Sequence, residues 1–321
     1  MTTVSNDLDS APRDAIPASG DQPLRFDGRV AVITGAGSGL GRAHALLLAH
    51  RGARVVVNDL GTTIEGEGAA ESRANRVVEE IRAAGGEAIA DSGDIARPAG
   101  AKALVERALS EYGRLDILIN NAGVLRDCSF ARMSLADFEC VVTVHLLGSI
   151  YVTKAAWPTM QQQAYGRIVL ITSHVGLYGN FGQTNYAAAK LGVVGFMNAL
   201  KIEGRTHNIL VNAVAPLAAT RMTAGSPLDA LAPLLKPERV SAVVAWLCHE
   251  ALEDSGLIVA TGGGYIARVQ FVEGRGVQFD SNVAITLETV RQNWRRALDM
   301  SDSQSFEQAH NAIAARVLPK N

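Results

Sequence analysis

The segment that most restricts the fold of this chain lies between residues 29 and 49. Residues 29–33 (RVAVI) form an apolar, β-branched run of strand length, and a glycine-rich stretch, residues 34–41, follows it directly. Residues 43–49 then have the alanine- and leucine-rich composition of a helix. A strand joined to a helix through a tight glycine turn is the opening unit of a βαβ arrangement. The segment therefore predicts a parallel sheet with helices packed on its faces.

The spaced glycines of this turn predict a nucleotide site. Gly35, Gly39 and Gly41 would permit a tight turn, the approach of backbone to a pyrophosphate, and close packing of helix against strand. Ser38 and Leu40 lie between them, where unpaired N–H groups at the start of the helix would bind the phosphates. The alternative is a glycine-rich turn without a ligand, which the flanking strand and helix disfavour.

An acid at the end of the second predicted strand indicates which dinucleotide binds. Residues 54–59 (RVVVND) form a strand-like run that ends in Asp59. A carboxylate there accepts hydrogen bonds from both ribose hydroxyls of the adenosine and repels a 2′-phosphate. Neither Ser38 nor Leu60 offers a positive charge for such a phosphate. We therefore predict NAD rather than NADP as the cofactor; the alternative is a solvated acid at a strand end.

Tyr186 and Lys190 predict the chemistry. They stand four residues apart, and the alanines at 187–189 favour a helix that places both side chains on one face. A phenol has an unperturbed pKa of about 10, and an ammonium one turn away would lower that pKa. Ser173 lies thirteen residues upstream, and its hydroxyl would hold a substrate oxygen while Tyr186 exchanges a proton with it. The three residues predict a catalyst that interconverts an alcohol and a carbonyl.

Strands and helices alternate along the rest of the chain. Further strands are predicted at residues 87–90, 115–119, 168–172, 210–214 and 257–260, and helices at residues 72–84 and 136–160. We therefore predict an α/β fold, a Rossmann-type doubly wound parallel sheet with helices on both faces. Ligands bind such sheets at the carboxyl ends of the strands. The residues expected there are Gly35, Asp59, Asn121, Ser173 and Pro216.

The order of these motifs resembles the short-chain dehydrogenase/reductase family. Residues 34–41 (TGxxxGxG), residues 120–123 (NNAG), Ser173 and the Tyr186–Lys190 pair follow one another at that family's spacing, over about residues 26–265. The resemblance implies that Lys190 binds the nicotinamide ribose, Tyr186 is the general acid and base, and Ser173 fixes the substrate hydroxyl. The further cofactor contacts that it implies are Asp94 at the adenine amino group, Asn121, Ala122, Gly123, Pro216 and Thr220.

Other stretches are similar to one branch of the family, the (3R)-hydroxyacyl-CoA dehydrogenases that form part of peroxisomal multifunctional enzymes. These stretches are residues 25–30, 56–61, 125–127, 178–183, 246–250 and 286–294. The branch implies oxidation of (3R)-3-hydroxyacyl-CoA to 3-ketoacyl-CoA in fatty-acid or steroid side-chain β-oxidation. A 17β-hydroxysteroid is the alternative substrate. A non-catalytic NAD-binding regulator is a remote alternative, which the intact Tyr186–Lys190 pair disfavours.

Two positions depart from the family pattern. Many members have an asparagine where this chain has His145, and its main-chain carbonyl holds a water of the proton relay. Any residue supplies such a carbonyl, so the relay could persist; a histidine that only packs the helix is as good an interpretation as a catalytic one. Pro216 is followed by Leu217 rather than glycine, and the next loop is one residue shorter than usual. Either Thr220 or Thr223 is therefore the expected cofactor contact.

Composition limits the other classes of function. Lys and Arg (30) nearly balance Asp and Glu (32), at a net charge of −2, which disfavours nucleic-acid and membrane-surface partners. No apolar run approaches the ~20 residues that span a bilayer. Cys128, Cys140 and Cys248 lack metal-ligand spacing and fit a reducing compartment. We therefore expect no metal.

We expect three parts in the chain. Residues 1–24 are polar and are predicted to be a disordered leader rather than a signal peptide, and residues 25–265 would form the NAD-binding catalytic domain. Residues 266–321 would pack on this domain or on a neighbouring subunit of a homodimer or homotetramer, or would wall off the acyl or steroid end of the pocket. The last residues, LPKN, are not a peroxisomal signal, so a cytoplasmic location is expected.

Overall fold

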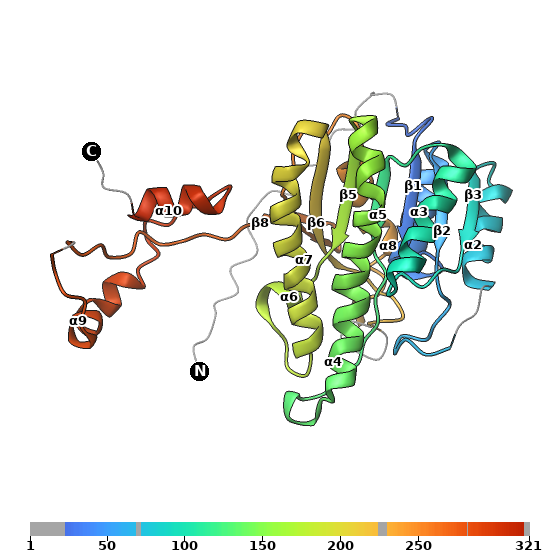
Figure 1. Cartoon of the computed structure of the whole chain (residues 1–321). Coiled ribbons are helices and arrows are strands. Elements are labelled where there is room, and N and C mark those ends of the chain that lie inside the picture. The colour runs from blue at the N-terminus through green and yellow to red at the C-terminus, as the bar shows by residue number, and fades with distance from the viewer. Residues whose placement is uncertain (1–22, 69–71, 224–229, 281, 318–321) are drawn as a thin grey trace.

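The computed structural model describes residues 23–68, 72–223, 230–280 and 282–317 (Figure 1). The predicted leader lies outside these ranges except for its last two residues. The described residues form one eight-stranded sheet in the order β3-β2-β1-β4-β5-β6-β7-β8, parallel except for β8. Its strands are β1 (Val30–Thr34), β2 (Arg54–Asn58), β3 (Glu87–Asp91), β4 (Ile117–Asn120), β5 (Gly166–Ile171), β6 (Ile209–Leu217), β7 (Ile258–Gly262) and β8 (Tyr265–Val269).

Helices connect the parallel strands and cover both faces of the sheet. They are α1 (Gly39–His50), α2 (Ser72–Ala83), α3 (Pro98–Tyr112), α4 (Leu135–Val142), α5 (Gly148–Gln163), α6 (His174–Tyr178), α7 (Thr184–Glu203) and α8 (Pro237–Cys248), followed in the tail by α9 (Leu287–Ala297) and α10 (Ala309–Val317). Three short turns are η1 (Phe130–Arg132), the π-helical η2 (Thr143–Leu147) and η3 (Arg205–His207).

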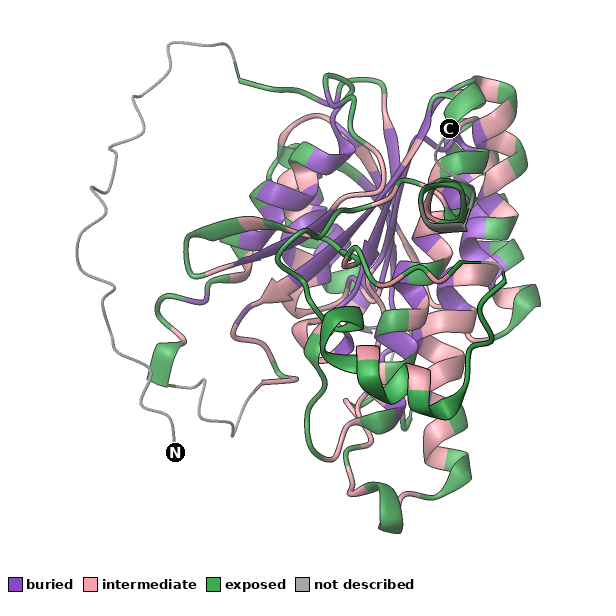
Figure 2. Ribbon diagram, turned by 90° about the vertical axis from the view of Figure 1, so that its left-hand side faces the viewer, coloured by how far each residue is buried: buried purple, intermediate pink, exposed green. Residues whose placement is uncertain are grey.

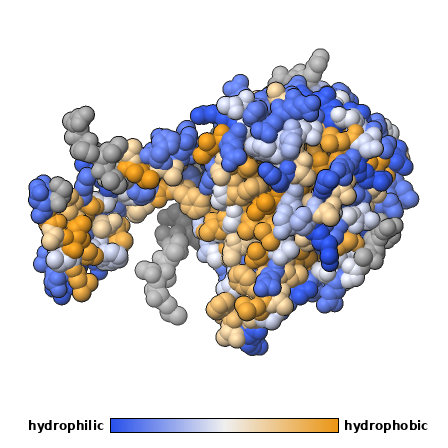
Figure 3. Space-filling view, viewed as in Figure 1, coloured by the Kyte–Doolittle hydropathy of each residue, from blue (hydrophilic) through white to orange (hydrophobic). Residues whose placement is uncertain are grey.

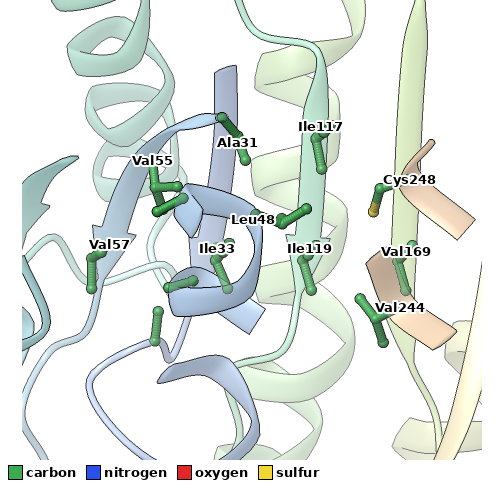
Figure 4. Close-up of a cluster of buried hydrophobic side chains, with 14 of the residues drawn as sticks. Ala31, Ile33, Leu48, Val55, Val57, Ile117, Ile119, Val169, Val244 and Cys248 are labelled. Carbon is green, nitrogen blue, oxygen red and sulfur yellow. The ribbon is translucent and has the colours of Figure 1, made fainter. Parts of the chain in front are cut away.

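The alternation of side chains along the central strands explains the two helical layers. In β1, Ala31 and Ile33 point into a core shared with α1, α2 and α8 (Figure 4), whereas Val30 and Val32 point into a second core shared with α3, α5 and α7. All five residues of β1 are buried, and the middle of the sheet is buried throughout (Figure 2). A strand covered on both faces has to be apolar at every position. The predicted doubly wound fold is confirmed.

The predicted helix at 136–160 is longer than expected and is interrupted. It runs as α4, the π-helical turn η2 and α5, so a wider turn carries residues 143–147. By length and composition alone the stretch Leu135–Gln163 could cross a membrane, with a mean hydropathy of 1.5 over its most apolar window. The sequence shows no unbroken apolar run there, because charged residues interrupt the stretch. Here it packs against α3 and α7, which accounts for its apolar character.

The tail leaves the sheet after an edge strand. β8 pairs antiparallel with β7 and crosses the predicted boundary at 265, so the chain departs from the sheet beyond Val269. Residues 270–280 and 282–317 then run out from the body of the molecule and carry α9 and α10 (Figure 1). The side chains along one face of α9 are exposed, Leu287 (79%) and Trp294 (53%) among them. The division of the chain into these parts stays a prediction.

Candidate functional site

A cavity of about 700 Å³ lies at the carboxyl ends of the central strands. β1 has β2 on one side and β4 on the other, so the chain order reverses there, and ligands bind such sheets beyond this point of reversal. Of the predicted site residues only Gly41 does not line the cavity. Those that line it are Gly35, Ser38, Gly39, Leu40, Asp59, Asp94, Asn121, Ala122, Gly123, Ser173, Tyr186, Lys190, Pro216 and Thr220.

The glycines of the first turn are required by close contacts. A Cβ atom on Gly41 would stand 2.3 Å from the carbonyl oxygen of Gly35, and one on Gly35 would stand 2.7 Å from Cα of Ala122. Gly35 and Gly39 also have positive φ angles, 63° and 54°, which glycine adopts without strain. Gly41 therefore packs α1 against β1, as expected, and leaves the N-terminus of α1 open to the cavity.

Asp59 is fixed by two backbone groups. Its Oδ2 accepts a hydrogen bond from Gly37 N at 2.8 Å, and its Oδ1 accepts one from Gly61 N at 2.7 Å. A carboxylate has about four acceptor positions, so each oxygen keeps one for a ligand. The side chain is nearly buried and borders the cavity. These features fit a carboxylate that binds a ribose diol.

Asn121 ties the ends of two strands together. Its Nδ2 donates to the carbonyl oxygens of Thr34 and Gly35, both at 3.0 Å. In return the Thr34 hydroxyl accepts from the amides of Asn121 and Ala122, at 3.0 and 3.1 Å. The Asn121 side chain thus joins the ends of β1 and β4. Asp94 lies just past β3, where its Oδ1 caps the amide of Ala96.

The three predicted catalytic residues come from two neighbouring elements. Ser173 lies two residues after the end of β5 and caps α6, its Oγ accepting from Val175 N at 3.1 Å. Tyr186 and Lys190 lie one turn apart on α7, as the spacing predicts. Lys190 Nζ donates to the carbonyl of Ile171 at 2.5 Å and lies 5.6 Å from the centroid of the Tyr186 ring.

Burial dominates the acidity of this pair. Burial raises the pKa of Tyr186 to about 12, which a hydrogen bond from Ser173 partly offsets. Burial also lowers the pKa of Lys190 to about 7. The expected lowering of the Tyr186 pKa by Lys190 is therefore not found: burial raises this pKa, and the hydrogen bond with Ser173 is what opposes the rise. Asp127, across the cavity, adds a further increase to the Tyr186 pKa.

Two charged residues that line the cavity, Asp127 and Arg221, are not among the predicted site residues. Arg221, in the loop after β6, donates to Ser38 Oγ at 3.0 Å, so a guanidinium does stand beside the glycine turn. Asp127, after β4, accepts from Gln183 at 2.7 Å, and burial raises its pKa. Both residues lie far in sequence from the groups they approach, so no local pattern could reveal them. Thr220 and Thr223 both line the cavity, and Thr220 is the one that faces Gly39.

A family model described as short chain dehydrogenase matches residues 29–229. The chain belongs to this family. It is accordingly an oxidoreductase. The motifs around the cavity are the same ones on which the resemblance to this family rests. A short-chain type dehydrogenase/reductase of Mycobacterium tuberculosis is 46% identical over 276 residues, which cover 86% of this chain and 96% of that protein.

The similarity extends to larger enzymes of the family. Peroxisomal multifunctional enzyme type 2 of Drosophila melanogaster is 48% identical over 289 residues, 89% of this chain but 48% of that protein. The structure of the full-length Drosophila enzyme matches with a TM-score of 0.77 at 41% identity, over 90% of this chain and 48% of that one. This chain thus spans about half the length of that relative.

A steroid enzyme is more distantly similar. The 7α-hydroxysteroid dehydrogenase solved with NADH and 7-oxo glycochenodeoxycholic acid matches with a TM-score of 0.68 at 31% identity. The match covers 75% of this chain and 95% of that one. A nicotinamide cofactor is therefore consistent with both the family and the shape of the cavity.

Replacing Tyr186 by phenylalanine tests the proton donor. Tyr186→Phe keeps the ring and removes the hydroxyl, so turnover of a secondary alcohol should fall by ~10²–10⁴-fold, the usual contribution of general acid–base catalysis. Cofactor affinity, measured by fluorescence titration, should be unchanged. A variant that keeps more than about a tenth of wild-type turnover would contradict the assignment.

The pH dependence of wild-type turnover provides a second test of the role of Tyr186. Oxidation needs Tyr186 without its proton and reduction needs it with the proton. Because the pKa of Tyr186 is raised to about 12, oxidation should accelerate from about pH 6 to about pH 10 while reduction does not.

Proposed function

We propose that this chain is an NAD-dependent (3R)-3-hydroxyacyl-CoA dehydrogenase, which reversibly oxidises the 3-hydroxyl of the thioester to a ketone. The observation that carries the proposal is the arrangement of one cavity: Ser173, Tyr186 and Lys190 line it together with the glycine turn and Asp59. The similarity to multifunctional enzymes over 89% of this chain supports an acyl-CoA substrate in particular.

Residues of this chain would bind the cofactor, hold the substrate and move the proton. When bound, NAD supplies the carbon that accepts the hydride. The N–H groups at the start of α1 would bind its phosphates, Asp59 would bind the adenosine ribose, and Lys190 would bind the nicotinamide ribose. Ser173 holds the substrate oxygen in place while Tyr186 takes the hydroxyl proton. In the reverse direction Tyr186 returns that proton to the ketone oxygen.

Apolar side chains in the cavity support a substrate with a hydrocarbon part. The cavity wall includes Leu125, Val144, Val175, Phe181, Leu217 and Met222. Phe181 is 88% exposed, and apolar surface gathers at the end of the molecule where α4 begins (Figure 3). An apolar wall that continues onto the surface suits an acyl chain, which extends well beyond the reacting carbon.

A hydroxysteroid is the second candidate substrate, because the apolar wall and the similarity to a hydroxysteroid dehydrogenase favour it as well. The decisive assay follows NAD reduction with (3R)- and (3S)-3-hydroxyacyl-CoA of several chain lengths beside 17β-estradiol. We expect turnover of the (3R) thioesters alone. Oxidation of estradiol with none of the thioesters would replace the proposed substrate, and equal rates with both enantiomers would overturn it.

NAD, rather than NADP, is proposed as the cofactor because of Asp59. Its carboxylate is held rigidly at the end of β2, where it would repel a 2′-phosphate. Asp59→Ala should weaken NAD binding by roughly 1–3 kcal/mol, the usual cost of a lost charged acceptor. Because Arg221 stands beside Ser38, the same variant should also bind NADP more tightly than the wild type does.

Arg221→Gln provides the control for this cofactor experiment. Combined with Asp59→Ala, it should remove the gain in NADP affinity, since the cation available to the 2′-phosphate is then lost. Both affinities are measured by titration of protein fluorescence. A wild-type protein that already prefers NADP would contradict the role given to Asp59.

We also propose that the chain forms a homodimer or homotetramer through its tail. Leu287, Val290, Trp294 and Leu298 recur at helical spacing along α9 and are all exposed, and such an apolar stripe usually packs against another surface. No described residue beyond Thr223 lines the cavity of a single chain.

Truncation of the tail tests this assembly. A chain that ends after Val269 keeps β8 and should sediment as a smaller species than the full chain at equal concentration. Trp294→Ser is the milder variant and should shift the same equilibrium, because it removes one large apolar contact. Unchanged sedimentation of both proteins would exclude the tail as the subunit contact.

A further inference from the structure

Two loop segments form a rim of the cavity beside the catalytic tyrosine. Residues 125–128 follow β4 and residues 180–183 lead into α7, and both contribute side chains to the cavity wall. The segments are joined where Cys128 N donates to the carbonyl oxygen of Gly182 at 2.9 Å. Neither segment contains an expected cofactor contact. This rim is therefore available to the substrate.

Asp127 is fixed on this rim by a short chain of hydrogen bonds. Asn180 Nδ2 donates to Gln183 Oε1 at 2.8 Å, and Gln183 Nε2 donates to Asp127 Oδ2 at 2.7 Å. Gln183 is the N-cap residue of α7 and lies three positions before Tyr186. The negative charge of Asp127 acts on that phenol and raises its pKa. The helix that carries Tyr186 thus also holds this carboxylate in place.

The other carboxylate oxygen of Asp127 is free to bind a ligand. No described residue donates a hydrogen bond to Oδ1, and none forms an ion pair with the side chain. The neighbouring Arg126 donates instead to Asp137 at 2.8 Å and to the carbonyl oxygen of Glu65 at 3.0 Å. Asp127 is exposed at the cavity wall, so it is ionised near neutral pH. It therefore offers a charge and unused acceptor positions.

The other titratable groups on this side of the cavity do not pair with this charge. Burial favours the neutral form of Lys190, whose pKa is lowered to about 7, and it also lowers the pKa of His145. The full set of these groups is Cys140 on α4, His145 in η2, His174 on α6, and Tyr186 and Lys190 on α7. Asp127 therefore adds an unpaired negative charge next to the place where the substrate reacts.

We propose that Asp127 is a specificity-determining residue: it accepts a hydrogen bond from the amide N–H that follows the thioester sulfur of an acyl-pantetheine, and it repels the carboxylate of a free 3-hydroxy acid. These two substrates share the reacting hydroxyl and differ only at C1 and beyond, where one is neutral and the other is an anion. A negative charge on the wall distinguishes them without contact to the reacting carbon. The inference rests on the proposed function, because it explains how that substrate class is selected.

Three probes test this selection in the wild type with NAD. The first is the N-acetylcysteamine thioester of (3R)-3-hydroxybutyrate, which carries the amide; the second has CH₂ in place of the amide N–H; the third is the free acid. We expect kcat/KM to be at least about fivefold lower for the CH₂ analogue, and lowest for the free acid. Because salt screens repulsion, the relative rate on the free acid should rise from about 0.05 to about 0.5 M salt.

Asp127→Asn tests the carboxylate itself. The new amide can accept from Gln183 through its oxygen, which leaves an NH₂ donor in place of the free acceptor. The preference for the amide thioester over its CH₂ analogue should disappear, and kcat/KM for the free acid should rise by at least about tenfold. The rise of oxidation rate with pH should also move to lower pH, because loss of a nearby negative charge lowers the pKa of Tyr186.

Glu139→Gln is the matched control for charge. Glu139 is an exposed acid of α4 beside the lining residue Cys140, but it does not line the cavity itself. This variant should keep the wild-type preferences and pH profile. Unchanged preferences in Asp127→Asn, or the same changes in both variants, would overturn the proposal.

The wild-type comparison decides the matter if thermal denaturation shows that Asp127→Asn does not fold. Equal kcat/KM for the amide thioester and its CH₂ analogue then contradicts the role of Asp127, whereas a preference for the amide supports it. If the wild type oxidises neither thioester, the proposed function fails and the role of Asp127 fails with it. If it oxidises both equally well, only the role of Asp127 fails.

Discussion

The joined ends of β1 and β4 fix the geometry on which the rest of the site depends. Asn121 and Thr34 exchange hydrogen bonds across these two neighbouring strands, while the chain leaves them toward opposite faces of the sheet. The crevice thus opens where the strands are most tightly held. Gly35 permits this approach, because any side chain there would collide with Ala122. Because these strand ends are fixed, α1, β2 and α7 can place groups around one ligand from three directions.

The loss of water is the second constraint, and it acts on the catalytic pair, Tyr186 and Lys190. It raises the pKa of Tyr186 and lowers that of Lys190, so both groups are driven toward their neutral forms. The ionised tyrosine therefore depends on specific neighbours: the Ser173 hydroxyl and a correctly held ammonium. Lys190 is held through Ile171 O.

One predicted helix and one predicted catalytic residue have features that the sequence did not predict. The helix predicted at 136–160 contains the turn η2, whose wider spacing no apolar periodicity distinguishes from an ordinary helix. Ser173 serves both as a cap of α6 and as a partner of Tyr186. A hydroxyl has one donor and two acceptor sites, so one residue can satisfy both interactions at once.

The sequence alone determined the layered fold and most of the cavity wall, from Gly35 to Lys190. These features depend on local patterns: apolar runs of strand length, glycines in a turn, and two side chains one helical turn apart. Only the tertiary structure decided which distant groups meet there. Arg221 reaches Ser38 from a loop 183 positions away, and His145 meets both Val124 and Tyr186. Such contacts depend on how helices, strands and loops pack together in space, and the spacing of residues along the chain does not reveal that packing.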